Sequence, residues 1–522
     1  MTAMVVKALV KSSEYHDSVS LMLVGRALNS MAGVRDAAAV MATEANKSIL
    51  ASAGLLTDEV RVATVNDLAI VVSAEAVPLA DAALQEAEKL LKKKASSESA
   101  VQFKPRTIRS ALSMNAEANV AVISVAGRYA ADEAWEALRR GLHVLLFSDH
   151  VSLEDEIALK HYARDHSLLL MGPGAGTAIL NNVALGFANV VPCGPIGIVS
   201  AAGTGLQEVS SMIARQGAGI SQGIGVGGRD LSREVGGIMM LAGLSALQED
   251  PATEVIALVS KPPAEEVARE ILRQVSASKK ATVVCFLGGD AGLMSGVPNL
   301  LLAHTLQECA WLALKAANFV SQDIKTAEDA ENAQLTKTAH ELRGRLGEGQ
   351  KFIRGLFSGG TLCYEAQVIW RDMLRLPVHS NAPLPGGPAL DDPMRSCGHT
   401  AVDMGEEVFT SGRPHPMIDN SLRIRRMLQE ARDPEVAVIL LDVVLGYGAH
   451  ADPVSELGPA AEEACRAARD AGRDLLVLAS VTGTEQDPQG YGHTVSALER
   501  AGVVVCECNA SAAKLAGMLA SE

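Results

Sequence analysis

One phrase that occurs twice constrains the fold of this chain more than any other feature. Residues 197–209 read GIVSAAGTGLQEV, and residues 355–366 read GLFSGGTLCYEA. In each copy an apolar run is followed by Ser, small residues, Gly-Thr and then, after three further residues, Glu. An apolar strand that turns into a helix through small residues is typical of α/β proteins, so its recurrence predicts a duplicated domain.

Further parallels extend the repeat beyond this phrase. The sequence GGRD around Arg229 parallels SGRP around Arg413, and LQEDPATEVIALVS parallels LQEARDPEVAVILL. The second copy is longer, and we place its extra residues in the Pro-rich loop 381–394. Two copies are too few for a solenoid, so we expect two related doubly wound domains.

Chain length and the alternation of strand and helix patterns predict the domain organisation. A chain of 522 residues suggests three or four domains, and its low aromatic content (3%) suits helices packed closely on sheets. We expect an α/β fold. Its predicted segments are a small N-terminal α/β domain (1–97), a Rossmann-like domain (98–190), a first flavodoxin-like domain (191–320), a helical linker (321–350) and a second flavodoxin-like domain (351–522).

Charge and cysteine pattern narrow the classes of function. The net charge of −15 disfavours nucleic acid as a partner, because phosphate backbones require clustered Lys and Arg. The eight cysteines include no C-x-x-C pair, and no His/Cys spacing indicates a metal site. The N-terminus is too polar for a signal peptide, and the uncharged run 173–207 is broken by Asn, Pro and Gly. We therefore expect a cytoplasmic protein that binds neither a membrane nor a metal.

The repeated turn has the chemistry of an anion site. Backbone N–H groups at a helix N-terminus lack partners inside the helix and carry partial positive charge, so they bind phosphate or carboxylate. Ordinary helix capping would explain one such turn, but two copies packed with pseudo-twofold symmetry would aim both helix ends at one cavity. The predicted substrate- or phosphate-binding residues of the turns are Ser200, Gly203, Thr204, Ser358, Gly359, Gly360 and Thr361. GPGAGT (172–177) is either a further anion-binding turn or a simple tight turn.

Two glutamates follow the turns at equivalent positions. Glu208 and Glu365 lie one turn into the predicted helices. There each carboxylate can orient a protonated or cationic group beside the anion, and we take both as catalytic candidates. The alternative is a plain first-turn Glu that the helix dipole favours.

The second copy supplies further candidates. His450 follows a buried strand run, at the edge where open α/β sheets bind ligands, and is the third catalytic candidate. Arg229, Arg413 and His415 lie in the parallel loops and are the remaining predicted anion ligands, with surface ion pairs as the alternative. Asp442, inside an apolar strand, is either a partnered structural carboxylate or part of the site.

The first copy resembles the alpha subunit of succinyl-CoA synthetase. The similarity covers GIVSAAGTGLQEV and the preceding NVAVISVAGRYAADEAWEALRRGLHVLLFS and LLLMGPGAGT. The second copy, with EVAVILLDVVLGYGAHADP and LLVLASVTGT, is similar to the C-terminal domain of that enzyme's beta subunit. In the synthetase two such helices face each other across a phosphorylated histidine. The resemblance implies that this chain carries both helices.

Parts of the synthetase pattern are missing. Its catalytic Gly-His-Ala-Gly phrase follows the strand equivalent to ATVVCFLGGD, where this chain reads AGLMSGVPNLLLAHTLQ. Its Gly-rich CoA loop has no counterpart in residues 1–50, and its nucleotide-binding domain has no counterpart either. The resemblance therefore implies neither a phosphohistidine nor use of ATP by this chain alone.

Phrases along the whole chain are similar to the FdrA family, among them DSVSLM, MATEANKSIL, FSGGTLCYEA, GRPHPMID, LDVVLGYGAHADP and GTEQDPQ. This resemblance implies a subunit of a phosphate-dependent carbamoyl or acyl transferase, of the oxamate carbamoyltransferase type that forms carbamoyl phosphate. Phosphate is then a substrate, and other enzyme subunits are partners in an oligomer. The alternatives are a CoA-binding acyl-CoA synthetase, like succinyl-CoA ligase, without its own nucleotide domain, and a non-catalytic scaffold subunit.

Overall fold

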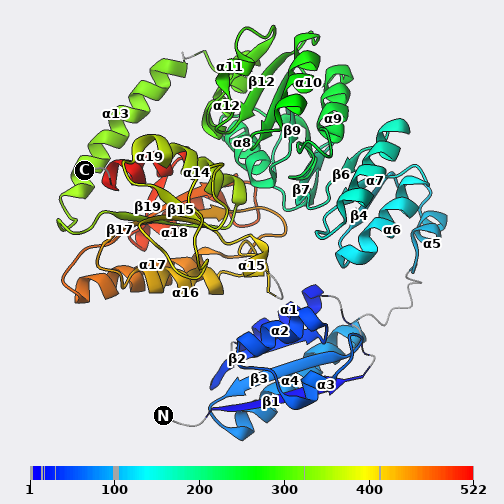
Figure 1. Ribbon diagram of the computed structural model, residues 1–522, viewed down its shortest axis with the longest axis vertical. Helices are drawn as coiled ribbons and strands as arrows, with labels where there is room; N and C mark the ends of the chain where they lie inside the picture. Colours follow the sequence, from blue (N-terminus) through cyan, green and yellow to red (C-terminus); the bar gives the residue numbers. More distant parts are fainter. Residues whose placement is uncertain are drawn as a thin grey trace. The chain divides into compact units, whose positions relative to one another are not determined.

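The computed structural model describes residues 4–12, 14, 16, 18–29, 31–97, 105–321, 324–410 and 413–520. The chain forms two compact units, whose elements are labelled in Figure 1. The first unit comprises Met1–Pro105 and Glu407–His415, and the second comprises Arg106–Glu406 and Pro416–Glu522. Both copies of the repeated phrase lie in the second unit.

The first unit is an antiparallel sheet in the order β1-β3-β2 with helices on both faces. Its elements are β1 (Val5–Lys11), α1 (Ser18–Asn29), β2 (Val34–Met41), α2 (Glu44–Ser52), α3 (Asp58–Val62), β3 (Leu68–Ala74), α4 (Val77–Ser97) and α15 (Glu407–Thr410). Successive residues of β3 alternate between two apolar clusters, so Ile70 packs with α1 and α4 while Val71 packs with α2 and α3. These strands and helices agree with the small α/β domain predicted at the N-terminus. The side chains of Thr43 and Thr57 cap the starts of α2 and α3.

The second unit begins with a parallel sheet in the order β4-β5-β6. Its elements are α5 (Ile108–Met114), β4 (Val120–Ile123), α6 (Gly127–Leu138), β5 (His143–Leu146), α7 (Leu153–Asp165) and β6 (Leu170–Met171). The alternation of strand and helix confirms the βαβ pattern predicted for this segment. A buried ion-pair cluster fastens α7 to the next domain, because Lys160 Nζ donates to Glu156 (2.8 Å) and to Asp230 (2.8 Å).

The first copy of the repeat forms a seven-stranded sheet in the order β13-β12-β11-β9-β10-β7-β8. Its elements are β7 (Thr177–Leu180), β8 (Val183–Gly186), β9 (Cys193–Ser200), α8 (Gly203–Arg215), β10 (Ile220–Gly225), α9 (Ile238–Glu249), β11 (Val255–Ser260), α10 (Glu265–Ser276), β12 (Ala281–Phe286), α11 (Ala291–Met294), β13 (Leu300–Leu302) and α12 (Leu306–Ala316). The strands β9 to β13 are parallel and take the flavodoxin order 2-1-3-4-5. The antiparallel hairpin β7–β8, whose residues the sequence assigned to the domain 98–190, extends this sheet beyond β10.

The second copy forms a parallel sheet of six strands in the order β15-β16-β14-β17-β18-β19. After the connecting helix α13 (Ile324–Arg343), its elements are β14 (Phe352–Phe357), α14 (Gly360–Met373), β15 (Val378–Ser380), β16 (His399–Asp403), α16 (Ser421–Glu430), β17 (Val436–Val444), α17 (Val454–Asp470), β18 (Leu476–Thr482), α18 (Tyr491–Arg500), β19 (Val504–Cys506) and α19 (Asn509–Ala520). Without the edge strand β15, the order is again 2-1-3-4-5. The two copies therefore share one topology.

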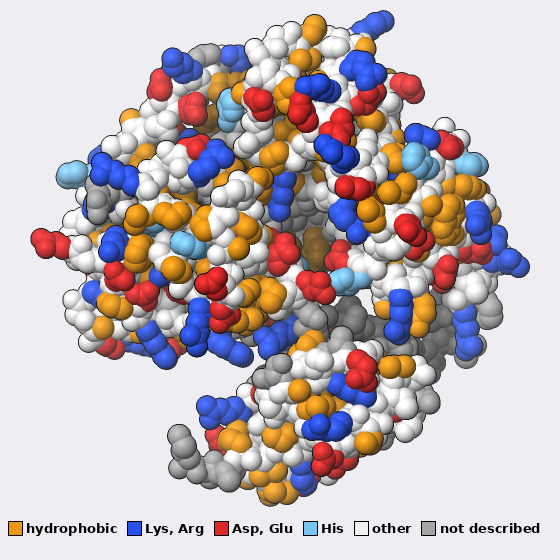
Figure 2. Space-filling model, viewed as in Figure 1, with side chains coloured by type: hydrophobic (Ala, Val, Ile, Leu, Met, Phe, Trp, Pro, Cys, Tyr) orange, Lys and Arg blue, Asp and Glu red, His pale blue; other side chains and the backbone are white. Residues whose placement is uncertain are grey.

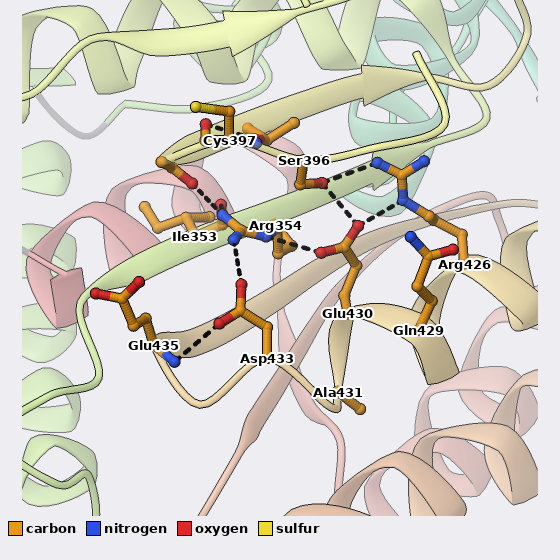
Figure 3. Close-up of polar contacts among 12 residues, drawn as sticks. Ile353, Arg354, Ser396, Cys397, Arg426, Gln429, Glu430, Ala431, Asp433 and Glu435 are labelled. Carbon is orange, nitrogen blue, oxygen red and sulfur yellow. Dashed lines mark hydrogen bonds and ion pairs between the residues drawn. The ribbon is translucent and has the colours of Figure 1, made fainter. Parts of the chain in front are cut away.

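A buried network holds the end of the Pro-rich loop to the second sheet (Figure 3). Arg354 of β14 is 2% exposed and donates to Glu430 (2.8 Å), to Asp433 (2.8 Å) and to the carbonyl of Gly398. Ser396 donates to Glu430 (2.7 Å), so the loop and the end of α16 share one carboxylate. Because every charge in the network has a partner, its burial is tolerated.

The structure confirms the α/β class, with a small N-terminal domain, a Rossmann-like domain and flavodoxin-like domains. The exact domain boundaries stay a prediction. On the face that Figure 2 shows, Lys and Arg side chains lie interspersed with Asp and Glu side chains. None of the described helices combines the length and the apolar character needed to cross a membrane.

Candidate functional site

Both copies of the repeated phrase end a central strand and begin a helix. The strand order reverses beside β9 and beside β14, and ligands of open α/β sheets bind at such points. The helix α8 begins at Gly203 and α14 begins at Gly360, and neither start receives a hydrogen bond from a capping side chain. The polarised N–H groups of both helix starts are therefore uncapped by side chains.

The two helix starts contact each other, and the contacts are reciprocal. A Cβ atom placed on Gly359 would lie 2.8 Å from Cγ2 of Thr204, and one placed on Gly205 would lie 3.2 Å from Cγ2 of Thr361. Each threonine thus occupies the space that a side chain on the other turn would need. The two positive helix ends are brought side by side by residues with no or small side chains.

Three threonine hydroxyls surround these helix starts. Thr204 and Thr361 are 7% and 5% exposed, and their hydroxyls make no hydrogen bond to any described residue. Thr177, the last residue of GPGAGT, has its Oγ1 3.5 Å from the position of a Cβ on Gly203 and likewise has no side-chain partner in the described part of the chain. Hydroxyls beside the two helix starts that have no partner in the described part of the chain can donate to a ligand with acceptor oxygens.

The serines of the phrase have protein partners. Ser200 Oγ donates to the carbonyl of Ala202 (2.7 Å) and accepts from the N–H of the same residue (3.0 Å). Ser358 Oγ donates to Asp442 (2.9 Å). Both hydroxyls therefore shape their turns, and the role of the two serines as phosphate ligands stays a prediction.

Both oxygens of the Asp442 carboxylate, which lies below α14, accept hydrogen bonds from the protein. It accepts from the N–H groups of Ser358 (2.7 Å) and Gly359 (2.8 Å) and from Nη1 of Arg423 (2.8 Å). Asp442 and Arg423 are both buried. These contacts favour the first of the two alternatives that the sequence left open for Asp442.

A chain of polar contacts connects this carboxylate with His450. Arg423 Nη2 donates to Asn420 (3.0 Å), and Asn420 Nδ2 donates to Glu456 (3.1 Å). His450 Nε2 lies 3.3 Å from the other oxygen of Glu456, and its Nδ1 accepts from the N–H of Asp452 (3.0 Å). His450 is thus linked to the start of α14 through the chain's own side chains, and its catalytic role stays a prediction.

Asp403, at the end of β16, is a second carboxylate beside the start of α14. A Cβ placed on Gly360 would lie 2.5 Å from its Oδ2. Its Oδ1 accepts from the N–H of Gly405 (3.0 Å), whereas Oδ2 has no hydrogen bond among the described residues. Burial raises the pKa of Asp403 to about 7, although the charge of Lys261 opposes that rise. The exposed Lys261 follows β11 and places its Nζ 5.3 Å from the ring centre of Tyr364 on α14.

Glu208 and Glu365 lie between the two copies, where each carboxylate accepts a hydrogen bond from the first N–H group of a helix. Glu208 accepts from the N–H of Asn509 (3.1 Å) and from the hydroxyl of Thr482. Glu365 accepts from the N–H of Leu306 (2.7 Å) and from Nδ2 of Asn509 (2.7 Å). Burial raises the pKa of Glu208, and it raises the pKa of Glu365 to about 7. These partners favour an interface role, and the catalytic role of both residues stays a prediction.

The predicted arginine and histidine ligands lie in separate places. Arg229 is half-exposed, pairs with Glu156 (2.8 Å) and donates to the carbonyl of Val151 (2.8 Å), so it faces the Rossmann-like domain. Arg413 and His415 belong to the segment that groups with the first unit. The parallel between GRD and GRPH therefore does not place these side chains equivalently, and their role as ligands stays a prediction.

Sequence reasoning missed Asp403 and Lys261 and did not connect Thr177 with the repeated turns. The sequence contains a signal for Asp403, because it is the polar residue that ends the apolar strand HTAVD. His450 was selected by the same criterion, since it follows an apolar strand run. Lys261 follows IALVS in the same way. Both residues end strands that flank a central strand, which is the place that the ligand rule for α/β sheets selects.

Comparisons with known proteins include a relative along the whole chain. The chain is 44% identical over 520 residues, 99% of its length and 98% of the relative's, to the uncharacterized protein YahF of Escherichia coli (strain K12). It is 26% identical over 165 residues to the alpha subunit of ADP-forming succinate–CoA ligase of Methanothermobacter thermautotrophicus, covering 31% of this chain and about half (55%) of the subunit. The structure of ATP citrate lyase from Methanothrix soehngenii with citrate and coenzyme A matches 42% of each chain at 18% identity, with a TM-score of 0.34.

Three family models match parts of the chain. The AllF heavy metal-associated domain matches residues 4–107, the CoA binding domain matches 194–288, and CoA-ligase matches 356–519. The CoA-binding match includes the start of α8, and the CoA-ligase match includes the start of α14. Backbone N–H groups, the Thr204 hydroxyl and the Lys261 ammonium fit the phosphate groups of CoA as well as free phosphate.

The residues of the first unit do not fit a heavy-metal ion. Soft metals prefer thiolate ligands, and residues 4–107 contain no cysteine. Their single histidine, His16, lies 2.9 Å from Glu14. Among the described residues, no group of three or more His, Cys, Asp or Glu side chains is placed to hold a metal.

Proposed function

The chain belongs to the family of succinyl-CoA ligase-like proteins that includes Escherichia coli YahF, and we propose that it binds phosphate or an acyl phosphate between the starts of α8 and α14. The reaction that this site serves is acyl transfer of the CoA-ligase type. The observation that carries the proposal is the reciprocal contact of the two uncapped helix starts, through Thr204 and Gly359 and through Gly205 and Thr361.

The chain's own groups would act on the phosphate as follows. The N–H groups of Gly203 and Gly360 and the hydroxyls of Thr204 and Thr361 hold its oxygens, and Lys261 adds a positive charge. Such fixed donors stabilise negative charge that grows on phosphate and on a tetrahedral acyl carbon. CoA, where it binds, supplies the thiol that accepts the acyl group. A nucleotide-binding partner subunit would supply ATP for synthesis in the ligase direction.

A second candidate is the carbamoyl transferase of the oxamate carbamoyltransferase type, in which phosphate attacks a carbamoyl group directly. The segment between β12 and α12 favours it. This segment contains one histidine, His304, which is exposed and whose backbone N–H donates to Glu308 (2.7 Å). Direct attack by phosphate needs no phosphohistidine, so this segment fits that chemistry without a substitute for the missing phrase.

The test is a titration of the full chain with phosphate, acetyl phosphate, carbamoyl phosphate and CoA, followed by calorimetry and thermal unfolding. A ligand at a hundred times its Kd should add about 2.7 kcal/mol of stability. Thr204→Val and Thr361→Val keep the side-chain shape and remove the hydroxyl, so each should weaken phosphate binding by about tenfold or more. Thr326→Val, on the exposed face of α13, is the matched control.

Each outcome separates the candidates. Stabilisation by CoA supports the ligase type, and stabilisation by carbamoyl phosphate without CoA supports the transferase type. If both valine variants bind phosphate as tightly as the unmodified chain, the anion binds elsewhere and the proposal is wrong. No binding of any probe by the full chain would favour the scaffold alternative.

A further inference from the structure

We propose that Asp403 selects the anion at the paired helix starts: its carboxylate accepts a hydrogen bond from inorganic phosphate and excludes anions that carry no proton, such as sulfate. The inference rests on the proposed function, because it concerns the same site. Phosphate keeps at least one acidic hydrogen at neutral pH and sulfate keeps none, so a carboxylate can distinguish two ions of nearly equal size and shape.

The position of Asp403 makes contact with a bound anion unavoidable. Its Oδ2 lies 2.5 Å from the position of a Cβ on Gly360, the first residue of α14. Ligand oxygens bound by the N–H groups of that helix turn would lie within hydrogen-bonding distance of Oδ2 or would be repelled by it. Asp403 is 3% exposed, so little water is available to screen the repulsion.

The two carboxylates below α14 differ in what they leave for a ligand. Asp442 gives its oxygens to Ser358, Gly359 and Arg423. Asp403 commits only Oδ1, to the N–H of Gly405, and its Oδ2 has no hydrogen bond within the described residues. A nine-tenths buried acceptor aimed at a helix start is thus open to a ligand that brings its own hydrogen.

The charged groups around Asp403 leave it able to discriminate. Lys261 lowers its pKa, while Glu406 and Asp442 raise it, and the Cys363 thiol lies close enough on α14 to respond to its charge. Burial is the largest effect and brings the pKa of Asp403 to about 7. Within the described residues, Lys261 forms no ion pair with any carboxylate, so Oδ2 is not taken by it.

Comparison of the two copies shows that this acidity is particular to one helix start. Asp403 pairs with Phe357 across the β14–β16 ladder. In the first copy, Val199 pairs with Ile224 across the β9–β10 ladder, and both side chains pack against α9. The strand β10 (ISQGIG) contains no acidic residue, so it gives the start of α8 no carboxyl group of the kind that β16 gives the start of α14. We assign the fully ionised phosphate oxygens to the α8 side and the protonated oxygen to the α14 side.

The test compares phosphate with sulfate by calorimetry on the full chain at about pH 8, where Asp403 is mostly ionised. The unmodified protein should bind phosphate at least about tenfold more tightly than sulfate. Asp403→Asn offers an N–H donor to either ion, so the two affinities should come within about threefold. Asp391→Asn, in the exposed Pro-rich loop, should keep the discrimination.

A failure of the proposed function and a failure of the role of Asp403 give different binding results. Binding of neither ion contradicts the proposed function itself. Equal binding of both ions, or discrimination that survives in Asp403→Asn, overturns only the role of Asp403. If that variant does not fold, the unmodified protein still decides: sulfate binding should strengthen about tenfold or more between about pH 8 and about pH 5.5, as Asp403 gains a proton and becomes a donor. A flat sulfate profile overturns the inference.

Discussion

Glu208 and Glu365 occupy equivalent positions on α8 and α14, and each caps the last helix of the other copy. Glu208 accepts from the N–H of Asn509, the first residue of α19, and Glu365 accepts from the N–H of Leu306, the first residue of α12. The two flavodoxin-like domains thereby exchange carboxylates across their interface. Because each glutamate satisfies a helix start that would otherwise be buried and unpaired, the exchange ties the folding of one copy to the other.

The raised pKa of Glu365 makes stability depend on pH. Burial raises this pKa to about 7 from an ordinary value of 4.5. Between these values the folded chain holds a proton that the unfolded chain has released, so this group lowers stability as pH rises, by about 1.4 kcal/mol per pH unit. Glu365→Gln should flatten the fall between about pH 5 and pH 7, measured by urea unfolding. Asp403, with a pKa also near 7, should leave a residual slope of the same sign.

The control for this prediction is Glu348→Gln, because Glu348 is exposed and precedes β14. Its stability profile should follow that of the unmodified chain at every pH. A constant difference in unfolding free energy between Glu365→Gln and the unmodified chain across the window would contradict the assigned pKa.

The sequence predicted the parts of the fold that depend on local patterns. Apolar runs followed by small residues identify β9 and β14 and the helices after them. Such runs can be recognised from sequence because apolar side chains are buried in strands and glycine permits tight turns. The hairpin β7–β8 was missed, although Asn181 and Asn182 turn it with positive φ angles of 47° and 64°, and such a two-residue turn is a known hairpin signal. The strands are short, and the uncharged run around them hides their alternation.

In the candidate site, too, the residues set by local patterns were predicted and those placed by tertiary packing were not. The helix starts at Thr204 and Thr361 are local features and were predicted. Asp403 enters the site only because β16 lies next to β14 in the sheet, and strand order cannot be read from the strand itself. The interface role of Glu365 was equally hidden, because a Glu in the first turns of a helix looks the same whether it faces a ligand or another helix.

Arg354 should be essential for stability. Its guanidinium is 2% exposed and is bound by Glu430 and Asp433 (Figure 3). Arg354→Ala leaves Oε2 of the buried Glu430 carboxylate without its arginine, while Arg426 still binds Oε1, and should cost about 3–5 kcal/mol in unfolding free energy. Arg371→Ala, which removes a half-exposed arginine paired with Asp372, should cost less than about 1 kcal/mol in the same urea titration. A similar loss in both variants would mean that the network contributes no more than a surface pair.

The contact between Thr204 and Gly359 is the strictest test of how the two helix starts meet. The backbone of Gly359 has φ −105° and ψ 113°, an extended conformation that alanine adopts freely. Any cost of Gly359→Ala therefore comes from the contact, where the new Cβ would lie 2.8 Å from Cγ2 of Thr204. We expect a loss of about 1–3 kcal/mol from overpacking, together with weakened phosphate binding.

A double-mutant cycle identifies that contact as the cause. Thr204→Ala removes the atoms in the way, so the double variant should recover part of the stability, with a coupling of about 0.5–3 kcal/mol. Gly349→Ala, where a Cβ would meet open space, should stay within about 0.5 kcal/mol of the unmodified chain. If the effects of Gly359→Ala and Thr204→Ala simply add, the two residues do not touch in solution. The helix starts would then be too far apart to share one anion, because this contact is what brings them side by side.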